Sequence, residues 1–204
     1  MIVVEKLINE LSKLPGIGRK SAVRLAFHLL KQSSKDLSDL SRVIVEVPES
    51  IKECGICHNF MDKKEKACPI CLDSRRSSEK LVIVSSVQDL MAVEEVGYYK
   101  GRYHVLHGLI APLKGIGIED IRLESLVDRV RGNSEIKEII LAVTPNTDGE
   151  TTSIYLKNSI NKLNQSIKIT QIAKGVPVGS EIEYVDKMTL IRAIENRNWV
   201  FSSI

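Results

Sequence analysis

The first 30 residues carry apolar side chains at helical spacing in two consecutive stretches. In the first stretch the apolar positions have offsets of 0, 3, 4 and 7, which places them on one face of a helix. They are Val4, Leu7, Ile8 and Leu11. The second stretch starts near Arg19, and its shared face consists of Ala22, Leu25, Ala26, Leu29 and Leu30. The sequence Leu-Pro-Gly-Ile-Gly at 14–18 separates them, so the pattern predicts two helices joined by a tight hairpin.

A third helical pattern follows the hairpin and leads toward the middle of the chain. Its apolar positions are Leu37, Leu40, Ile44, Val47 and Ile51. Pro48 lies inside this pattern, and a proline removes a backbone hydrogen bond and clashes with the preceding helical turn. We therefore expect a kink or a break near Val47.

From residue 78 onward, short apolar runs alternate with helical stretches. The run Leu81-Val-Ile-Val84 is continuous, as in strands that are buried on both faces. Further strands are predicted at 103–106, 138–143 and 167–172, and helices at 87–96, 118–130, 149–163 and 186–196. In the second of these helices, Glu119 and Asp120 would occupy the first turn, where the helix dipole favours negative charge. The alternation predicts a parallel sheet with helices on both faces.

All four cysteines lie in one stretch, as Cys54-Gly-Ile-Cys57 and Cys68-Pro-Ile-Cys71 with ten residues between the pairs. Two residues between cysteines let both thiolates of a knuckle point at one metal ion, and the ten-residue arm can bring the second knuckle to face the first. Four thiolates leave no open coordination position, which is typical of a structural zinc site. We predict that Cys54, Cys57, Cys68 and Cys71 hold one zinc ion per chain.

Three other interpretations of the cysteines stay open. Two disulfides would need an oxidising compartment. An iron site of the rubredoxin type uses the same shell of four sulfurs, and spacing does not distinguish it from zinc. A redox-active CxxC pair usually occurs once and at a helix start. His58 follows Cys57 directly, but because four thiolates already fill the shell, we expect His58 to be a solvated neighbour.

The hairpin has the features of a phosphate-binding turn. Gly16 and Gly18 let the backbone come close to a partner, and the first amides of the next helix point outward at the positive end of its dipole. Arg19, Lys20 and Arg24 lie within the first two turns of that helix and add positive charge. We predict that these five residues bind DNA through its phosphates, without reading sequence. The alternative is an ordinary structural corner between two helices.

Composition narrows the classes of function. The 204 residues include 29 basic and 26 acidic side chains, so the net charge of +3 requires any basic surface to be local. Aromatic residues make up 4%, too few for the base-stacking platforms of many single-strand-binding proteins. The N-terminus lacks a signal-peptide layout, and no apolar run approaches the length of a membrane span. With reduced cysteines, we expect a cytoplasmic protein that does not bind membranes.

Several segments, in this order along the chain, resemble the RecR family of bacterial recombination mediators over nearly the whole length. They are Leu14-Pro-Gly-Ile-Gly18 with Lys20-Ser-Ala22 and Arg24 to Leu30, the four-cysteine knuckle, Gly101-Arg-Tyr-His-Val-Leu106, Pro112-Leu-Lys-Gly-Ile-Gly117, and Gly175-Val-Pro-Val-Gly179 with Glu183, Asp186, Thr189 and Leu190. The resemblance implies that the α/β part is a Toprim domain, the fold shared by topoisomerases and primases.

The expected fold class is thus a multidomain protein with α+β and α/β parts. We expect a helix-hairpin-helix DNA-binding domain over 1–53 and a four-cysteine zinc finger over 54–77. A Toprim domain, a parallel sheet with flanking helices, would cover 78–178, and a C-terminal helical segment 179–204. The apolar and aromatic tail at 199–204 is a candidate subunit contact.

The acidic residues that Toprim enzymes use are missing at the matching positions. Those enzymes hold magnesium with a glutamate after the first strand and an Asp-x-Asp pair after the third. Here the positions are Ser85, Thr144 and Asn146. The alternative function is a magnesium-dependent nuclease or primase-like enzyme, which would need carboxylates at these three positions. A small iron redox protein is a third possibility for the function.

Three acidic residues remain near the strand ends: Asp89, Asp148 and Glu150. We interpret them as charges at helix starts. Asp148 and Glu150 are also candidates for contact with a basic partner protein.

For function, the resemblance implies a DNA clamp without enzymatic activity. RecR proteins assemble as ring-like tetramers and act with RecO, and in some settings with RecF, to help load RecA onto single-stranded DNA coated by single-strand-binding protein. We expect the same partners here.

Overall fold

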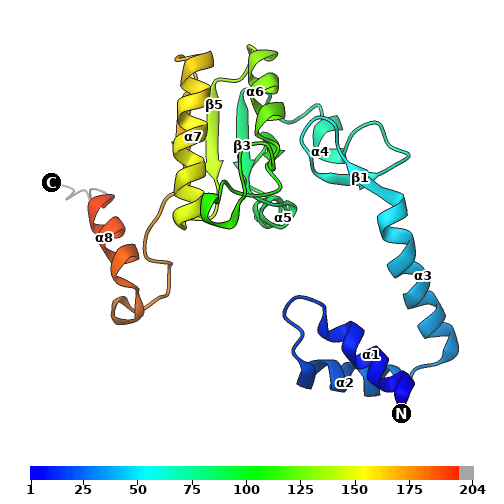
Figure 1. Cartoon of the computed structure of the whole chain (residues 1–204). Coiled ribbons are helices and arrows are strands. Elements are labelled where there is room, and N and C mark those ends of the chain that lie inside the picture. The colour runs from blue at the N-terminus through cyan, green and yellow to red at the C-terminus, as the bar shows by residue number, and fades with distance from the viewer. Residues whose placement is uncertain (198–204) are drawn as a thin grey trace. The chain divides into compact units, whose positions relative to one another are not determined.

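The computed structural model describes residues 1–197 (Figure 1). The chain divides into two compact units, residues 1–52 and the part that begins at Glu53. The candidate subunit contact at 199–204 lies outside the described residues. In the described part of the chain, no helix is long and apolar enough to cross a membrane.

In the first unit, α1 (Ile2–Ser12) and α2 (Arg19–Leu29) pack against each other, as the apolar pattern predicts. Ile8 of α1 and the two alanines of α2, Ala22 and Ala26, are buried between them. Because alanine side chains are small, the two helices can approach closely. The polar face of α2 is left at the surface, and it carries the basic residues of the hairpin.

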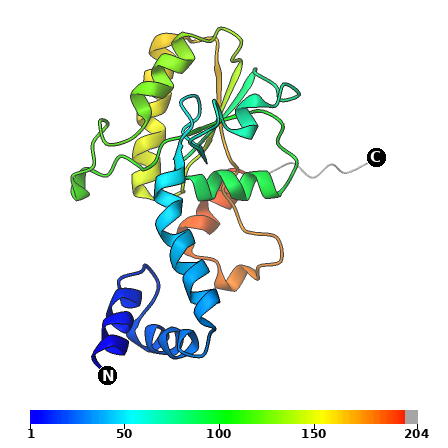
Figure 2. The same ribbon diagram turned by 90° about the vertical axis from the view of Figure 1, so that its right-hand side faces the viewer.

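The helix α3 (Ser34–Ser50) forms the rest of the first unit. Ser33 caps its N-terminus by accepting a hydrogen bond of 3.1 Å from the backbone of Asp36. We expected a kink or a break near Val47, and the break does not occur: the helix continues past Pro48 and ends at Ser50 (Figure 2). The proline sits in the last turn, where removing one backbone bond interrupts few others.

A short cysteine module (residues 54–77) follows. The strands β1 (Ile51–Glu53) and β2 (Phe60–Asp62) pair as a two-stranded sheet, and the four-residue helix α4 (Pro69–Leu72) completes the module. Its buried residues are Cys54, Cys57 and Cys68 together with Met61 and Ala67, and Cys71 is partly buried. So small a core gives the module little stability of its own, as is common where a metal holds a fold together.

The sheet body (residues 78–173) is built on four parallel strands, β3 (Lys80–Val84), β4 (Arg102–Val105), β5 (Glu138–Ala142) and β6 (Lys168–Gln171). Their order in the sheet is β4-β3-β5-β6, with Val82 opposite Tyr103 on one side and Ile140 on the other. Each strand boundary lies within one residue of the prediction from sequence. Because the strands are parallel neighbours, the carboxyl ends of β3, β4 and β5 meet at the same edge of the sheet.

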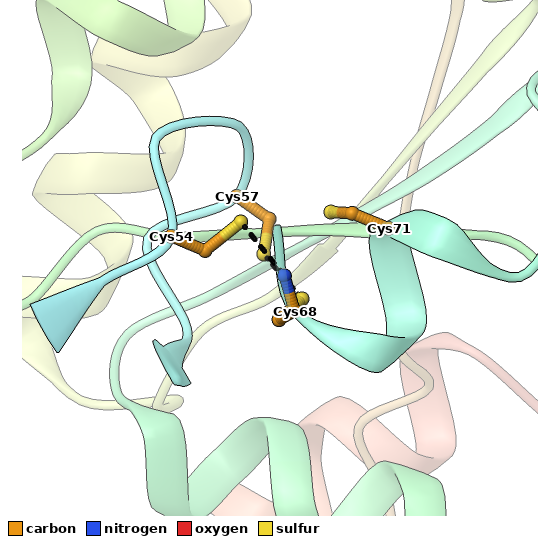
Figure 3. Close-up of side chains that lie close together, drawn as sticks. All are labelled: Cys54, Cys57, Cys68 and Cys71. Carbon is orange, nitrogen blue, oxygen red and sulfur yellow. Dashed lines mark hydrogen bonds between the residues drawn. The ribbon is translucent and has the colours of Figure 1, made fainter. Parts of the chain in front are cut away.

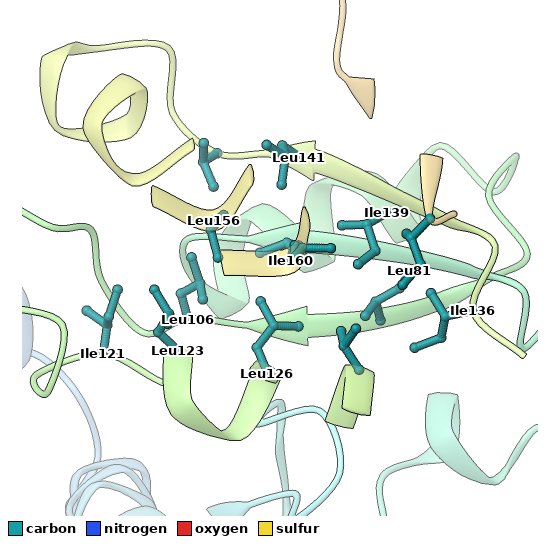
Figure 4. Close-up of a cluster of buried hydrophobic side chains, with 14 of the residues drawn as sticks. Leu81, Leu106, Ile121, Leu123, Leu126, Ile136, Ile139, Leu141, Leu156 and Ile160 are labelled. Carbon is teal, nitrogen blue, oxygen red and sulfur yellow. The ribbon is translucent and has the colours of Figure 1, made fainter. Parts of the chain in front are cut away.

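Helices cover both faces of this sheet. On one face, α6 (Leu123–Arg131) and α7 (Thr147–Leu163) enclose the larger core, which includes Leu81, Ile139, Leu126 and Ile160 (Figure 4). On the other face, α5 (Val87–Glu95) packs on alternate residues of the same strands. The predicted α/β architecture is confirmed.

One helix start differs from the expectation. The helix predicted at 118–130 begins at Leu123, so Glu119 and Asp120 precede it and do not occupy its first turn. The segment before α6 is held by a tertiary hydrogen bond, in which the backbone amide of Arg122 donates to the carbonyl of Leu106, at the end of β4, at 2.8 Å. Asp120 instead accepts a bond of 2.7 Å from the backbone of Gly117.

Beyond β6 the chain forms a short 3-10 turn, Ile182–Tyr184, and the helix α8 (Lys187–Glu195), which is capped by Asp186. A second 3-10 turn, Pro112–Lys114, lies earlier, between β4 and α6. The segment after β6 is tied to α7 through Glu150, which pairs with Lys174 and, at 2.9 Å, with Arg192.

Candidate functional site

The structure brings the four cysteines together. Their sulfur atoms all lie within 4.8 Å of one another, and those of Cys57 and Cys68 are 3.4 Å apart (Figure 3). A tetrahedral shell with zinc–sulfur bonds of 2.3 Å places neighbouring sulfurs about 3.8 Å apart. The cluster thus has the donor set and the dimensions for one metal ion.

Local structure explains how the cysteines converge. Cys54 follows β1 directly, and its backbone amide donates 2.7 Å to the carbonyl of Asn59, which closes the first knuckle. Cys68 is the N-cap residue of α4 and Cys71 lies three residues later, so this short helix brings both sulfurs of the second knuckle to the cluster. The backbone amide of Cys68 also faces the sulfur of Cys54 at 3.5 Å, across the two knuckles. The hydrogen bond between the two sulfurs raises the pKa of the Cys57 thiol and lowers the pKa of the Cys68 thiol.

His58 is not the solvated neighbour expected from sequence. Its side chain is 14% exposed, and its two ring nitrogens form hydrogen bonds with Glu53 at 3.1 Å and with Ser125 at 2.9 Å. Glu53 in turn accepts two bonds from Arg122, at 2.9 and 3.0 Å. These bonds join the first knuckle to the start of α6, so His58 has a structural position between the module and the sheet body.

Glu53 is expected to stabilise the fold in a pH-dependent way. The two bonds from Arg122 hold the pKa of Glu53 at about 2, below its ordinary value of 4.5. A depressed carboxyl pKa stabilises the folded state above pH 4.5, and this contribution is lost as the pH falls toward 2. With the side chain partly exposed, Glu53→Gln should lower the free energy of unfolding by about 1–2 kcal/mol at pH 7.

Urea unfolding of both proteins across this pH range measures the difference. The gap between wild type and variant should narrow as the pH falls, whereas a gap that stays constant would contradict the ion-pair explanation. Glu124→Gln, which removes an exposed carboxylate from α6, is the control and should leave unfolding nearly unchanged.

The carboxyl ends of β3, β4 and β5 surround one cavity of about 570 Å³, called here the strand-end cavity. Its wall contains Ser85 after β3, His107 after β4, and Thr144 and Asn146 after β5. The backbone amide of Thr144 donates to the Ser85 hydroxyl at 3.3 Å, so these two positions are direct neighbours. The side chain of Asn146 accepts a bond of 2.8 Å from Gly149 and caps α7. The side chains of Ser85 and Asn146 thus accept hydrogen bonds from the backbone.

The nearby acidic residues have partners inside the chain. Asp89 and Ser86 form a reciprocal capping box at the start of α5. Asp148, in the first turn of α7, pairs at 2.7 Å with Lys114, which lies 34 residues earlier. Glu150 pairs with Lys174 and Arg192, and the Lys174 ammonium in particular lowers the pKa of Glu150. The pairing of Lys114 with Asp148 cannot be read from the sequence, because only the folded sheet brings the two residues together.

The hairpin residues lie together at the surface of the first unit. Gly16 has a φ of +78°, a left-handed conformation that suits glycine, and Gly18 immediately precedes α2. Arg19 is ion-paired with Glu5 and bonds to Asn9 at 3.3 Å, which ties α2 to α1. Lys20 and Arg24 are exposed, and within the described residues neither forms an ion pair.

Charge is unevenly divided between the units. Residues 1–52 contain nine basic and six acidic side chains, which gives +3, and the remaining residues contain 20 of each sign. The whole net positive charge therefore belongs to the unit with the hairpin. Lys20 also lies at the positive end of the α2 dipole, where a cation is unfavourable unless an anion is bound.

Comparisons with known proteins agree with this arrangement. The family model described as "Toprim domain" matches residues 79–173, "RecR, helix-hairpin-helix" matches residues 4–47, and "RecR, C-terminal" matches residues 175–198. A recombination protein RecR from Chlorobium phaeobacteroides is 42% identical over 197 residues, covering 96% of each chain. Another from Dehalococcoides mccartyi is 46% identical over 195 residues, covering 96% of this chain and 93% of the relative.

A helix-hairpin-helix, a four-cysteine cluster and a Toprim sheet in one chain define a mixed α+β protein with the parts found in recombination proteins. The chain belongs to the RecR family of recombination proteins.

Proposed function

We propose that the protein is a DNA-binding recombination mediator without enzymatic activity of its own. One observation carries this proposal: at the strand ends where Toprim enzymes hold magnesium, the side chains are the hydroxyls of Ser85 and Thr144 and the amide of Asn146. Magnesium in such sites is held by carboxylates, and phosphoryl transfer depends on the charge that the metal supplies.

The remaining carboxylates at the cavity are poor substitutes. Asp89 is used in a helix cap, and Asp148 is neutralised by Lys114 at 2.7 Å. A magnesium ion at Asp148 would have to displace the lysine and would find neutral side chains at the other positions.

A cleavage assay on supercoiled plasmid with Mg²⁺ or Mn²⁺ tests the proposal. We expect no nicking above that of a buffer control. Metal-dependent nicking that copurifies with the protein and disappears in Asp148→Asn would overturn it in favour of a Toprim nuclease. Nicking that persists in Asp148→Asn at the wild-type rate would mark a contaminating enzyme.

We propose that DNA is bound at the hairpin, by Gly16, Gly18, Arg19, Lys20 and Arg24, through phosphates. The open position of Lys20 and Arg24 and the concentration of net charge in residues 1–52 support this. Because Arg19 is already paired with Glu5, its contribution to phosphate binding should be smaller than those of its two neighbours.

We propose zinc as the metal of the four cysteines, in a structural role. The support is the set of four sulfurs within 4.8 Å, a closed shell in which every donor is a thiolate. Rubredoxin-type iron would fit the same sulfurs, and it would give the purified protein a visible absorption band that zinc lacks. We place the protein in the cytoplasm, where cysteines stay reduced and available for a metal.

We further propose that the chain forms a homo-oligomer, with a ring tetramer as the expected form. A ring requires each chain to contact two neighbours. Among the exposed large apolar side chains of the described residues, one group lies on α3 in the first unit and another around α8 in the second. Those of α3 are Leu40, Val43, Ile44, Val45 and Val47, and those around α8 are Val178, Ile182, Tyr184, Met188 and Ile194.

As partners we propose RecO and RecF, with loading of RecA on single-stranded DNA as the outcome. Asp148 and Glu150 stay candidates for contact with RecO, although both already pair with basic residues of this chain. Unchanged RecO affinity of the double alanine variant would remove them. We retain the domain boundaries 1–53, 54–77, 78–178 and 179–204 as a proposal for designing separate fragments.

A further inference from the structure

The sheet body holds both knuckles of the cysteine module by their backbone carbonyls. Five carbonyls in the module accept hydrogen bonds from donors that lie on or next to β4 and on α6. In the first knuckle, the carbonyl of Ile56 accepts from the Arg129 side chain at 3.2 Å, that of Cys57 from the Val105 amide at 2.9 Å, and that of His58 from the His107 ring at 2.6 Å. In the second knuckle, the Arg102 side chain donates to the carbonyls of Ile70 at 2.6 Å and Cys71 at 3.0 Å. Three of these carbonyls belong to the first knuckle and two to the second.

Two of the donors, Arg102 and Arg129, bring positive charge to the metal cluster. Together with Cys71 they line a hollow of about 360 Å³ beside the second knuckle. Burial lowers the pKa of Arg129, while the charges of the nearby cysteine sulfurs act in the opposite direction, so the guanidinium and the thiolates are within electrostatic reach.

The charge of the metal cluster explains why arginine side chains lie beside it. Four thiolates around one divalent ion carry a net charge of −2, and burying such a charge is unfavourable unless cations lie close by. Arg102 and Arg129 supply two positive charges on the side of the cluster that faces the sheet body. Unlike lysine, arginine can keep its charge when buried and still bond to two acceptors at once.

Arg129 also serves the open edge of the sheet. β4 is an edge strand, and its outward backbone groups need partners other than a fifth strand. The Val105 amide donates to the first knuckle, and the Tyr103 carbonyl accepts 2.6 Å from Arg129, which also reaches Ile56. Arg129 therefore bridges the sheet edge and the first knuckle.

We propose that Arg102 and Arg129 are the counter-charges of the metal cluster and couple its occupancy to the order of the β4 edge. They are positioning residues, because they act on the thiolates and the knuckle backbone and leave the metal shell to the cysteines. This inference rests on the zinc site proposed above.

The test uses the full-length protein. Zinc content is measured first, and then the rate at which zinc passes to a colorimetric chelator is compared for wild type, Arg129→Gln and Arg102→Gln. Loss of a residue that supports metal ligands typically weakens binding 10–100-fold, so we expect release to be about 10-fold faster or more. Arg131→Gln is the matched control, since Arg131 lies on the same helix and pairs with Asp128.

A second measurement follows hydrogen exchange of the β4 amides, 102–105, in zinc-loaded and stripped wild-type protein. Stripping should increase exchange at Val105, and this increase should be smaller in Arg129→Gln, where the coupling is already weakened. Arg129→Lys keeps the positive charge but not the planar guanidinium group with its several donors. Its rate of zinc release should fall between those of wild type and Arg129→Gln.

The outcomes separate the two proposals. Wild-type protein without zinc would overturn the zinc site itself. Zinc-loaded variants that release the ion at the rate of Arg131→Gln would overturn the role of the arginines while leaving the zinc site intact. If the glutamine variants do not fold, two results decide: unchanged β4 exchange after stripping wild type, or zinc release from Arg129→Lys at the wild-type rate, would each overturn the coupling.

Discussion

Replacement of Cys68 by serine is expected to abolish stoichiometric metal binding and to unfold the cysteine module. Cys68 lies at the centre of the cluster, since its sulfur is 3.4 Å from that of Cys57 and its amide faces the sulfur of Cys54. Serine cannot supply a thiolate, and the remaining three sulfurs would leave the ion with an open position. Binding energy of structural zinc is folding energy, of the order of 10 kcal/mol or more at neutral pH.

Metal content and thermal unfolding measure this effect. If the metal carries the stability, Cys68→Ser and chelator-treated wild type should unfold at similar temperatures, both well below the zinc-loaded protein. A variant that keeps one equivalent of zinc and the wild-type unfolding temperature would contradict the four-thiolate site. The visible spectrum of the wild-type protein checks at the same time for iron.

The second large effect is expected at the hairpin. Lys20→Ala combined with Arg24→Ala should weaken DNA binding by at least 10-fold at moderate salt, because two exposed cations beside the start of α2 are lost. Each lost phosphate contact should also reduce the slope of log affinity against log salt by about 0.7 to 0.9. Fluorescence anisotropy with labelled DNA across a salt series measures both quantities.

The control for this variant removes equal charge from the same unit. Lys13→Ala with Arg42→Ala also lowers the net charge of residues 1–52 by two, but these side chains pair locally with Glu10 and Asp39. We expect the control to keep nearly the wild-type slope. Equal losses in both double variants would mean that overall charge, and not the hairpin, attracts DNA, and unchanged binding in both would place the DNA contact elsewhere.

The sequence predicted the elements better than the contacts between them. Apolar runs and helical periodicity follow directly from which faces are buried, so the four strands were located to within one residue. The start of α6 was placed too early, because Ile118 continues an apolar pattern while the backbone of Arg122 is bonded to the end of β4. Tertiary hydrogen bonds of this kind leave no trace in periodicity.

The cluster of cysteines could be predicted because spacing alone defines it, but its surroundings could not. Arg102 and Arg129 contact the knuckles across about 30 to 70 residues of chain, and either arginine could equally have been a solvated surface residue. His58 was misjudged for the same reason, since its partner Ser125 lies 67 residues away. Such residues become recognisable only when the fold shows which carbonyls and charges face them.

Without the cysteine module in place, β4 would expose a row of unpaired backbone groups of the kind that strands of other molecules recognise. A shortage of metal would then lower the amount of folded protein in the cell before it weakened any particular contact with DNA. Chains made under metal starvation would be expected to associate edge to edge and be lost to aggregates or proteases, so the amount of usable protein would follow the availability of the ion.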